Sequence, residues 1–308
     1  MKNYLHQYVS NFEFPSFYDI IKNSRFFKNH SFNESQNKLN GFKDKVVIIT
    51  GASSGIGKAM ALEFSSHGAK VVLASRSSDK LAEVANKIIE KGGESLVIPT
   101  DVSKERQCKV LVKKTINTFE RIDILINNAG ISMRANFQDV KLDVLKKLMD
   151  TNFWGSVYCT KYAIPHLIES KGSIIGVSSI CGITPLPGRT GYAASKHALD
   201  GFLETIRVEN IDKGLHVLIV HPGFTTSNIR NTALNELGIP QIDTPKDESK
   251  LMPAERVAKE IVDAVINKKR DITLTTEGRL ITWLYRRAPN LADRLIYNEM
   301  KKESGSPF

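Results

Sequence analysis

The sequence predicts an α/β protein with a Rossmann-type, doubly wound parallel sheet of seven strands and helices on both faces. Two observations predict it. Short, continuously apolar runs recur along the chain from Lys45 onward, and stretches with helical spacing of apolar residues lie between them. Strands that are apolar throughout belong to parallel sheets whose two faces are both covered. With right-handed crossovers, this alternation predicts the strand order 3-2-1-4-5-6-7.

Each predicted element follows from a run of residues. The predicted strands are, in chain order, VVIIT (46–50), KVVLAS (70–75), SLVIP (95–99), DILIN (123–127), SIIGVS (173–178), HVLIV (216–220) and DITLT (271–275). Between them, GKAMALEFSSHG (57–68) and SSDKLAEVANKIIEKGG (77–93) are typical of helices. In the second, Ser77 or Ser78 can serve as the N-cap and Gly92 can end the helix.

Three regions are expected along the chain. Residues 1–40 are rich in Asn, Phe, Tyr and Ser and predict a partly flexible N-terminal extension, in which 17–27 could form a short amphipathic helix. Residues 41–276 predict the Rossmann-fold catalytic domain. Residues 277–308 predict an amphipathic helical extension that is interrupted at Pro289. A chain of 308 residues is long enough for one large α/β domain of this kind.

The segments that follow the sixth and seventh strands are expected at the surface. Residues 225–252 are long and polar with two prolines, as in a lid over a substrate site at the carboxyl edge of the sheet. In the C-terminal extension, Leu280, Trp283 and Leu284 share one helical face, which packs on the domain in the simpler interpretation. Contact with a membrane surface is the alternative, because three arginines flank these apolar groups. They are Arg286, Arg287 and Arg294.

The composition excludes several classes of protein. Apolar residues make up 41% and charged residues 25% of the chain, as in globular proteins. The three cysteines, Cys108, Cys159 and Cys181, have no zinc-ligand spacing and are too few for a disulfide framework. No metal site is predicted. Cys181, close to Ser179 in the sequence, either lines the site or is a buried, inert thiol.

Charge and hydropathy limit the partners and the compartment. The net charge of +10 comes largely from lysines spread over the predicted helices. No arginine-rich arm or aromatic ladder accompanies them, so we expect no nucleic-acid partner. No apolar run reaches the roughly 20 residues that span a bilayer, and the N-terminus lacks the apolar core of a secretory signal. A cytoplasmic protein, peripheral to a membrane at most, is therefore expected.

A glycine-rich turn follows the first predicted strand. TGASSGIG (50–57) places Gly51 where the chain turns from strand to helix, Gly55 where the backbone must approach a phosphate, and Gly57 where the helix packs against the strand. The N-terminus of that helix offers free N–H groups and a partial positive charge to a pyrophosphate. Between a strand and a helix, this pattern predicts a dinucleotide site.

The end of the second predicted strand indicates which dinucleotide binds. An acidic residue at this point would bind the ribose 2′-hydroxyl of NAD(H). The chain instead has Arg76, which could pair with the 2′-phosphate of NADP(H). We therefore expect NADP(H) to be preferred over NAD(H). Asp101, after the third strand, could accept from the adenine amino group, and the NNAG segment (127–130) ends the fourth strand beside the expected crevice.

Three side chains in the second half could converge on one carbonyl oxygen. Tyr192 and Lys196 are four residues apart in a helical segment and so share one face. The lysine charge would stabilise phenolate and lower the phenol pKa from its ordinary value of about 10. Lys196 could also hold the nicotinamide ribose. Ser179, at the end of the fifth strand, would hydrogen-bond the substrate oxygen as negative charge develops on it.

These motifs, in this order, resemble those of the short-chain dehydrogenase/reductase family, in its compact single-domain branch. The resemblance runs from about Lys45 to residue 275 and includes TGASSGIG, NNAG, the interval from Ser179 to Tyr192, and Tyr192 with Lys196. It implies a fourth catalytic residue, Asn152, which is expected to hold a water in a proton relay from Lys196 to solvent.

The resemblance also implies contacts with the cofactor. After the sixth strand, Pro222 and Gly223 are expected to place Phe224 and Thr225 against the nicotinamide carboxamide. Together with the glycine-rich turn and the other strand ends, the expected cofactor contacts are Gly51, Ser53, Ser54, Gly55, Ile56, Gly57, Arg76, Asp101, Val102, Asn128, Ala129, Gly130, Tyr192, Lys196, Pro222, Gly223, Phe224 and Thr225.

The resemblance implies an NADP(H)-dependent oxidoreductase that interconverts a ketone or aldehyde and an alcohol by hydride transfer. The tails and the lid are similar to those of members that act on lipophilic ketones, such as steroid-like or long-chain acyl substrates. Two alternatives stay open: a 3-oxoacyl thioester reductase of fatty-acid synthesis, and a catalytically silent NADP(H) sensor or scaffold. The resemblance also implies a homodimer or homotetramer, built through helices near 150–170 and 190–213.

Overall fold

A computed structural model describes four parts of the chain, residues 41–226, 229–241, 251–303 and 306. The predicted N-terminal extension (1–40), with the helix expected over 17–27, lies outside the described residues. So do two stretches of the predicted lid, residues 227–228 and 242–250.

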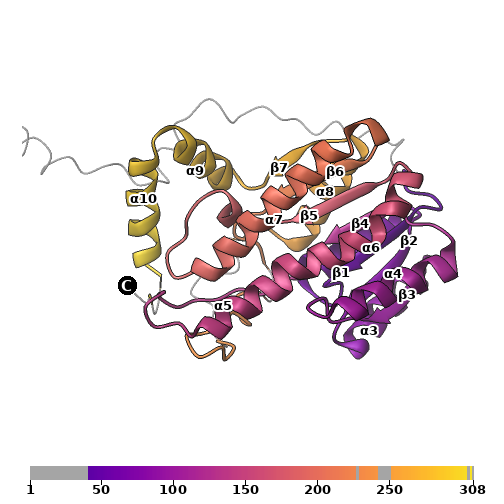
Figure 1. Cartoon of the computed structure of the whole chain (residues 1–308), viewed down its shortest axis with the longest axis horizontal. Helices are drawn as coiled ribbons and strands as arrows, with labels where there is room; N and C mark the ends of the chain where they lie inside the picture. Colours follow the sequence, from indigo (N-terminus) through magenta and orange to yellow (C-terminus); the bar gives the residue numbers. More distant parts are fainter. Residues whose placement is uncertain (1–40, 227–228, 242–250, 304–305, 307–308) are drawn as a thin grey trace, which may run out of the picture. The chain divides into compact units, whose positions relative to one another are not determined.

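A seven-stranded parallel sheet organises the described chain, with the strand order β3-β2-β1-β4-β5-β6-β7 (Figure 1). This confirms the predicted order. The strands are β1 (Val46–Thr50), β2 (Lys70–Ser75), β3 (Glu94–Pro99), β4 (Ile124–Asn127), β5 (Ser173–Val177), β6 (His216–His221) and β7 (Asp271–Thr273). The largest difference from the predicted runs is at β7, which ends at Thr273 instead of Thr275.

Helices cover both faces of the sheet (Figure 1). One face carries α2, α3 and α8, and the other carries α4, α6 and α7. The helices are α2 (Gly55–Ser66), α3 (Ser78–Ile89), α4 (Glu105–Phe119), α5 (Leu142–Leu148), α6 (Gly155–Glu169), α7 (Thr190–Glu209), α8 (Ala254–Ile266), α9 (Thr276–Arg287) and α10 (Pro289–Lys301). Shorter helical turns are η3 (Met149–Trp154), η4 (Ile180–Gly182) and η5 (Ile211–Lys213).

The strands contribute side chains to two separate apolar cores, one on each face of the sheet. This is because successive strand residues point to opposite faces. In β1, Val47 and Ile49 join the core beneath α2, α3 and α8. Val46 and Ile48 join the core beneath α4, α6 and α7. All four side chains are fully buried. A strand in this position needs apolar residues on both faces, and this is the reason that its sequence is apolar without alternation.

The signals at the ends of α3 are met only in part. Ser77 occupies the N-cap position, as one of the two predicted candidates, and its side chain makes no capping hydrogen bond. Gly92 adopts a φ of +77°, in the left-handed region that glycine favours. Its position just past the helix agrees with its expected role as the stop.

Two helices, α9 and α10, follow β7 and meet at the predicted interruption, Pro289. The face that α9 buries consists of Gly278, Ile281 and Thr282. Trp283 is 57% exposed. The face centred on Trp283 is therefore not the one that packs, contrary to the simpler interpretation of this helix. Within the described residues, no helix combines the length and the apolar character needed to cross a membrane.

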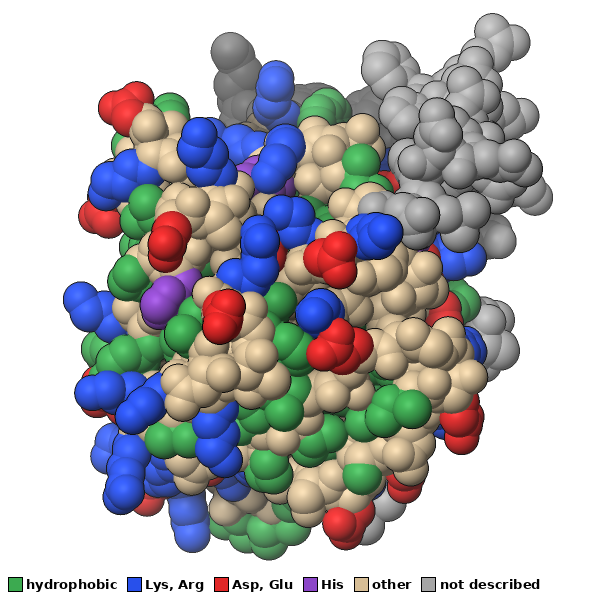
Figure 2. Space-filling model, turned by 90° about the vertical axis from the view of Figure 1, so that its right-hand side faces the viewer, with side chains coloured by type: hydrophobic (Ala, Val, Ile, Leu, Met, Phe, Trp, Pro, Cys, Tyr) green, Lys and Arg blue, Asp and Glu red, His purple; other side chains and the backbone are tan. Residues whose placement is uncertain are grey.

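The positive charge of the chain is dispersed. On the face shown in Figure 2, Lys and Arg side chains are interspersed with Asp and Glu side chains and do not gather into one basic patch. Several ion pairs at the surface join the two signs, such as Lys70 with Glu94 at 3.1 Å. Such exposed pairs stabilise the fold by about 1 kcal/mol at most.

Candidate active site

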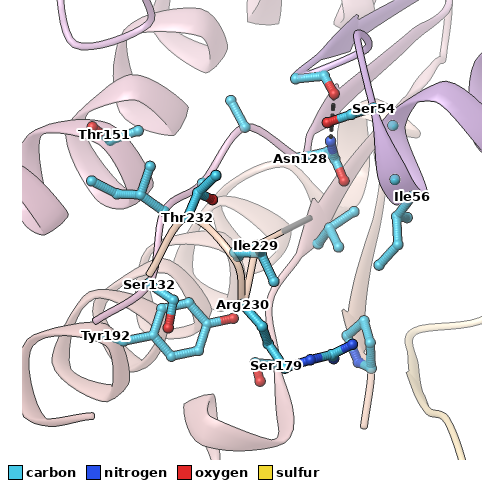
Figure 3. Close-up of a pocket in the computed structure, with 18 of the residues that line it drawn as sticks. Ser54, Ile56, Asn128, Ser132, Thr151, Ser179, Tyr192, Ile229, Arg230 and Thr232 are labelled. Carbon is cyan, nitrogen blue, oxygen red and sulfur yellow. Dashed lines mark hydrogen bonds between the residues drawn. The ribbon is translucent and has the colours of Figure 1, made fainter. Parts of the chain in front are cut away.

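A cavity of about 860 Å³ opens at the carboxyl edge of the sheet. The turns that follow the first six strands all contribute to its lining, as expected for a ligand site on a doubly wound sheet. Ser54, Ile56 and Asn128 lie toward one end of this cavity, and Ser179 and Tyr192 lie toward the other (Figure 3). The cavity therefore joins the two halves of the predicted site.

Every residue named above as a cofactor contact lines this cavity, from Gly51 to Thr225 in the sequence. Ser179 lines it as well. Asn152 is not part of the lining, and its side chain is fully buried behind the cavity wall. Cys181 both lines the cavity and is buried, and burial raises the pKa of its thiol. The two interpretations of Cys181 are thus compatible.

The turn between β1 and α2 has no room for side chains at two glycines. Gly51 adopts a φ of +68°, and a Cβ there would lie 2.8 Å from Nδ2 of Asn128. A Cβ at Gly57 would overlap the carbonyl oxygen of Gly51. The turn stays narrow for this reason, and the first N–H groups of α2 have no partner within the helix. A cradle of this kind fits the pyrophosphate of a dinucleotide.

Hydrogen bonds fix this turn to the end of β4. The Thr50 hydroxyl oxygen accepts from the backbone N–H groups of Asn128 and Ala129, each at 3.0 Å. Nδ2 of Asn128 donates to the carbonyl oxygen of Thr50 at 2.8 Å. Sequence reasoning missed this role of Thr50. The signal was a polar residue at the end of a strand that is otherwise apolar.

The end of the cavity near β2 carries two cations. Arg76 is exposed and lines the cavity. Lys80, in the first turn of α3, is also exposed and also lines the cavity. Asp101, at the end of β3, accepts from the backbone N–H and the hydroxyl of Ser103 at 3.0 and 2.8 Å. These bonds close the turn after β3. Lys80 was not predicted, although it follows Arg76 by four residues.

Tyr192 and Ser179 meet at the other end of the cavity. Tyr192 lies in the first turn of α7, and Ser179 precedes η4 just after β5. The two side chains lie close enough that Ser179 lowers the pKa of Tyr192. The Ser179 oxygen accepts from the backbone N–H of Cys181 at 3.2 Å. Both side chains border the same space in Figure 3. The structure thus brings these two predicted residues together.

Burial dominates the titration of Tyr192. It raises the pKa of Tyr192 well above the ordinary value, and the charge of Cys181 acts in the same direction. The hydrogen bond from Ser179 and the charge of Arg189 lower it by less. The expectation of a lowered phenol pKa was therefore wrong for this structure, because burial outweighs the lowering effects of Ser179 and Arg189. The phenol is protonated at neutral pH.

Lys196 is a buried cation beside Tyr192. Its ammonium lies 5.7 Å from the centre of the Tyr192 ring and donates to the carbonyl oxygen of Val177 at 2.8 Å. Burial lowers the pKa of Lys196 to about 8, and the charges of Asp200 and Cys181 oppose this decrease. Near neutral pH, the charge of Lys196 thus depends on its carboxylate neighbour.

Asn152 lies behind the cavity lining and holds the backbone of Ile131 in place. It lies in η3, a π-helical turn of a kind that recurs at functional sites. Its amide nitrogen donates to Ile131 O and to the Ser195 hydroxyl, both at 2.9 Å, and its amide oxygen accepts from Ile131 N at 2.8 Å. A Cβ at Gly130 would lie 3.3 Å from the Asn152 oxygen and 3.6 Å from the Lys196 nitrogen. Asn152 and Lys196 therefore both border Gly130.

Two buried carboxylate contacts near the site were not predicted. A carboxylate oxygen of Asp200 lies 3.0 Å from Nε2 of His221. A carboxylate oxygen of Glu303 lies 3.7 Å from a guanidinium nitrogen of Arg189. Asp200 could have been found, because it follows Lys196 by four residues and shares its helical face. No spacing or motif connects Glu303, beyond α10, to the start of α7.

The described part of the predicted lid reaches the cavity. Its lining residues from this segment are Thr225, Ile229, Arg230, Thr232, Leu234 and Pro240. Arg230 donates to the carbonyl oxygen of Thr225 at 2.7 Å. Leu234 is tied to the segment after β4, because its N–H donates to Ser132 O at 2.9 Å. In Figure 3, Ile229 and Thr232 lie between Asn128 and Tyr192.

The arrangement defines a class of protein. An anion cradle at a helix N-terminus opens into the same cavity as a protonated phenol, a hydroxyl and a buried ammonium. These groups fit a dinucleotide with a redox-active ring, positioned beside a carbonyl or alcohol group.

Comparison with known proteins identifies the family. Residues 45–237 match the short chain dehydrogenase family. The chain belongs to this family, and it is an oxidoreductase that acts on CH–OH and C=O groups.

Two relatives and one solved structure illustrate the similarity. The chain is 44% identical over 195 residues to 11-beta-hydroxysteroid dehydrogenase-like 2 of Arabidopsis thaliana, an alignment that spans 63% of each protein. It is 36% identical to 11-beta-hydroxysteroid dehydrogenase A of Sesamum indicum, over 82% of this chain and 75% of that protein. A short chain dehydrogenase/reductase from Burkholderia phymatum, solved with NAD, superposes with a TM-score of 0.74 at 23% identity, covering 82% and 96% of the two chains. At this identity, the superposition supports the fold.

Proposed function

We propose that the protein is an NADP(H)-dependent enzyme that interconverts a lipophilic ketone or aldehyde and the corresponding alcohol. One observation carries the proposal. Tyr192 and Ser179, which lie close together, line the same cavity as the glycine-rich turn from Gly51 to Gly57. A silent sensor or scaffold would need the cradle but would have no use for the pair.

The nicotinamide ring, when bound, supplies hydride to the carbonyl carbon or accepts it from the alcohol. Ser179 donates a hydrogen bond to the substrate oxygen and stabilises the negative charge that develops there. Tyr192 gives its proton to that oxygen during reduction, a role that suits a phenol whose pKa is raised by burial. In the reverse direction Tyr192 must lose this proton, and the charges of Lys196 and Arg189 then stabilise the phenolate.

The remaining residues of the site support this pair. Lys196 binds the ribose hydroxyls of the cofactor and stands beside Tyr192. Asn152 holds the backbone of Ile131 and borders Gly130 opposite Lys196. A water held near Asn152 would pass a proton from solvent to Lys196 and on to Tyr192. In this role Asn152 and Lys196 restore the phenol after each turnover.

NADP(H) is proposed over NAD(H) because of the charges near β2. Arg76 and Lys80 both line the cavity there, and no acidic residue follows the strand before Asp79. An NAD(H)-specific site would need a carboxylate for the 2′-hydroxyl. Two cations instead suit a 2′-phosphate.

The substrate class rests on the walls beyond Tyr192. Leu186, Leu234 and Pro240 are apolar residues of the cavity lining. The relatives named as 11-beta-hydroxysteroid dehydrogenases point in the same direction. The alternative substrate is a 3-oxoacyl thioester, which would carry phosphate groups to the mouth of the cavity. A homodimer or homotetramer in the cytoplasm, with peripheral contact to a membrane, completes the proposal.

The test of the proposed function is Tyr192→Phe. The change removes the proton donor and keeps the ring, so we expect NADPH oxidation with a panel of ketones to fall at least about 100-fold, as for loss of a general acid. NADPH affinity, measured by fluorescence titration, should stay within a few-fold. Thr205→Val, an exposed hydroxyl on the same helix, is the matched control. Retained turnover in Tyr192→Phe would reject Tyr192 as the proton donor.

A further inference from the structure

The segment that follows α10 reaches the substrate end of the cavity. Glu303 lines the cavity, and its side chain is only 5% exposed. One carboxylate oxygen lies 3.7 Å from Nη2 of Arg189, whose side chain is 11% exposed. Arg189 also lines the cavity and immediately precedes α7, three residues before Tyr192. An ion pair is therefore buried next to the residue that we propose as the proton donor.

The pair balances charge in a place where an unbalanced charge is unfavourable. Burial lowers the pKa of Arg189, and the carboxylate of Glu303 opposes this effect most strongly. The nearby Arg134 acts in the same direction as burial. The first N–H groups of α7 add partial positive charge at the same point. Without Glu303, this end of the cavity would hold a net positive charge, and a buried positive charge binds an anion.

Apolar side chains share the lining of the cavity with the pair. Leu186, Leu234 and Pro240 line the cavity with it. An apolar substrate that binds here contacts a part of the cavity lining in which Arg189 is already paired with Glu303. A substrate with its own carboxylate or phosphate at this end would compete with Glu303 for Arg189, and its charge would be repelled by the Glu303 carboxylate.

We propose that Glu303 is a specificity-determining residue, which occupies the anion position beside Arg189 and so makes the site select neutral lipophilic carbonyl compounds over anionic ones. The inference rests on the proposed function and narrows its substrate class. It disfavours thioesters of phosphate-bearing carriers wherever their charged groups approach Arg189. It also gives the C-terminal segment a direct part in substrate choice.

The experiment compares two substrates that differ in one charge, a long-chain oxo acid and its methyl ester. We expect the unmodified protein to prefer the ester in kcat/KM. Glu303→Gln keeps the shape and removes the charge, so the ratio of acid to ester should rise at least tenfold. Glu299→Gln removes a carboxylate of α10 that pairs with Lys302 at the surface, 3.4 Å away, and should leave the ratio unchanged. Adding Arg189→Gln to Glu303→Gln should return the ratio toward its original value.

A binding measurement separates this inference from the proposed function. Isothermal titration of the same two compounds, with NADP⁺ present, should show the same tenfold change in the ratio of affinities in Glu303→Gln. A ratio within twofold of the unmodified protein would overturn the inference, even if the ester is reduced normally. Binding of the ester without any turnover would overturn the proposed function, and the ratio of affinities would still decide the inference. Binding of neither compound would overturn both.

Discussion

Lys196 carries a buried positive charge that a second residue of the same helix helps to maintain. Burial lowers the pKa of Lys196 to about 8, and Asp200, four residues later, provides the largest opposing effect. Asp200 is itself held by His221, 3.0 Å away, and a Cβ at Gly182 would overlap its carboxylate. The position of Asp200 is therefore fixed by three elements, α7, β6 and η4.

This geometry predicts a shift in the pH dependence of cofactor binding. The ammonium of Lys196 is lost as pH rises through its pKa, so NADPH affinity should decline above about pH 8. Asp200→Asn removes the negative charge that raises this pKa. The ammonium is then lost at lower pH, and the decline should begin at lower pH, by about half a unit or more.

Fluorescence titration of NADPH between about pH 6 and pH 9.5 measures this effect. Glu204→Gln, which neutralises an exposed carboxylate of α7, should leave the onset where it is. The same onset in Asp200→Asn and in the unmodified protein would show that Asp200 does not maintain the charge of Lys196.

Arg76 is the residue on which the proposed choice of dinucleotide depends. Arg76→Asp replaces a cation with the carboxylate that suits a ribose 2′-hydroxyl, so the ratio of kcat/KM for NADPH to that for NADH should fall at least tenfold, or about 1.4 kcal/mol. Arg106→Asp, an exposed arginine of α4 outside the cavity lining, makes the same change in charge and serves as the control. Equal effects of the two substitutions would mean that the 2′-phosphate responds to overall charge.

The residues that sequence reasoning identified and those that it missed differ in how they are connected. Tyr192 and Lys196 are neighbours along one helix, and their spacing was enough to relate them. Arg189 and Glu303 are neighbours only because α10 brings the chain back to the start of α7. Local spacing holds no information about such a contact. Asp200 is an intermediate case. Its spacing from Lys196 could be seen in the sequence, but its burial could not.

At the scale of elements, the turn between β1 and α2 depends on two glycines that cannot be exchanged. A Cβ at Gly57 would overlap the carbonyl oxygen of Gly51, and the backbone itself would have to move. We expect Gly57→Ala to weaken NADPH binding at least tenfold and to lower the free energy of unfolding by about 1–3 kcal/mol, as overpacking does.

Gly201 provides the contrasting case within α7. A Cβ there would meet nothing within 4 Å, so Gly201→Ala should raise the free energy of unfolding by about 0.5–1 kcal/mol through helix propensity. Urea denaturation and NADPH titration of both variants test the pair of expectations. A Gly57→Ala protein that binds NADPH normally would show that the narrow turn is not needed for the cofactor.

The bounds of a strand or helix could be predicted from the sequence where a single physical rule determines its residue pattern. β1 and β2 are buried on both faces, so their apolar runs marked them nearly to the residue. η3, a π-helical turn, had no such marker in the sequence. The orientation of α9 was mistaken for a related reason. Its apolar residues occur on more than one side, and contact with the domain selects the side with Ile281.

At the scale of the whole molecule, exposed apolar side chains and arginines occur together on α9 and α10. The chain carries a net charge of +10. On α9 and α10, the large apolar side chains Trp283, Leu291 and Tyr297 are 57%, 39% and 45% exposed. Arg286 and Arg287 are exposed in the last turn of α9. Arginines beside an exposed tryptophan are typical of a surface that rests on anionic lipid.

This arrangement predicts binding to anionic membranes through α9 and not merely through net charge. Arg286→Glu with Arg287→Glu should reduce binding to vesicles that contain phosphatidylserine, because each basic residue near the surface contributes about 1 kcal/mol. Lys113→Glu with Lys114→Glu, at exposed positions of α4, changes the net charge by the same amount. Sedimentation with vesicles should show a loss of at least tenfold for the first pair and a much smaller loss for the second. Equal losses would mean that binding follows net charge alone, and no binding of the unmodified protein would remove the membrane from the proposal.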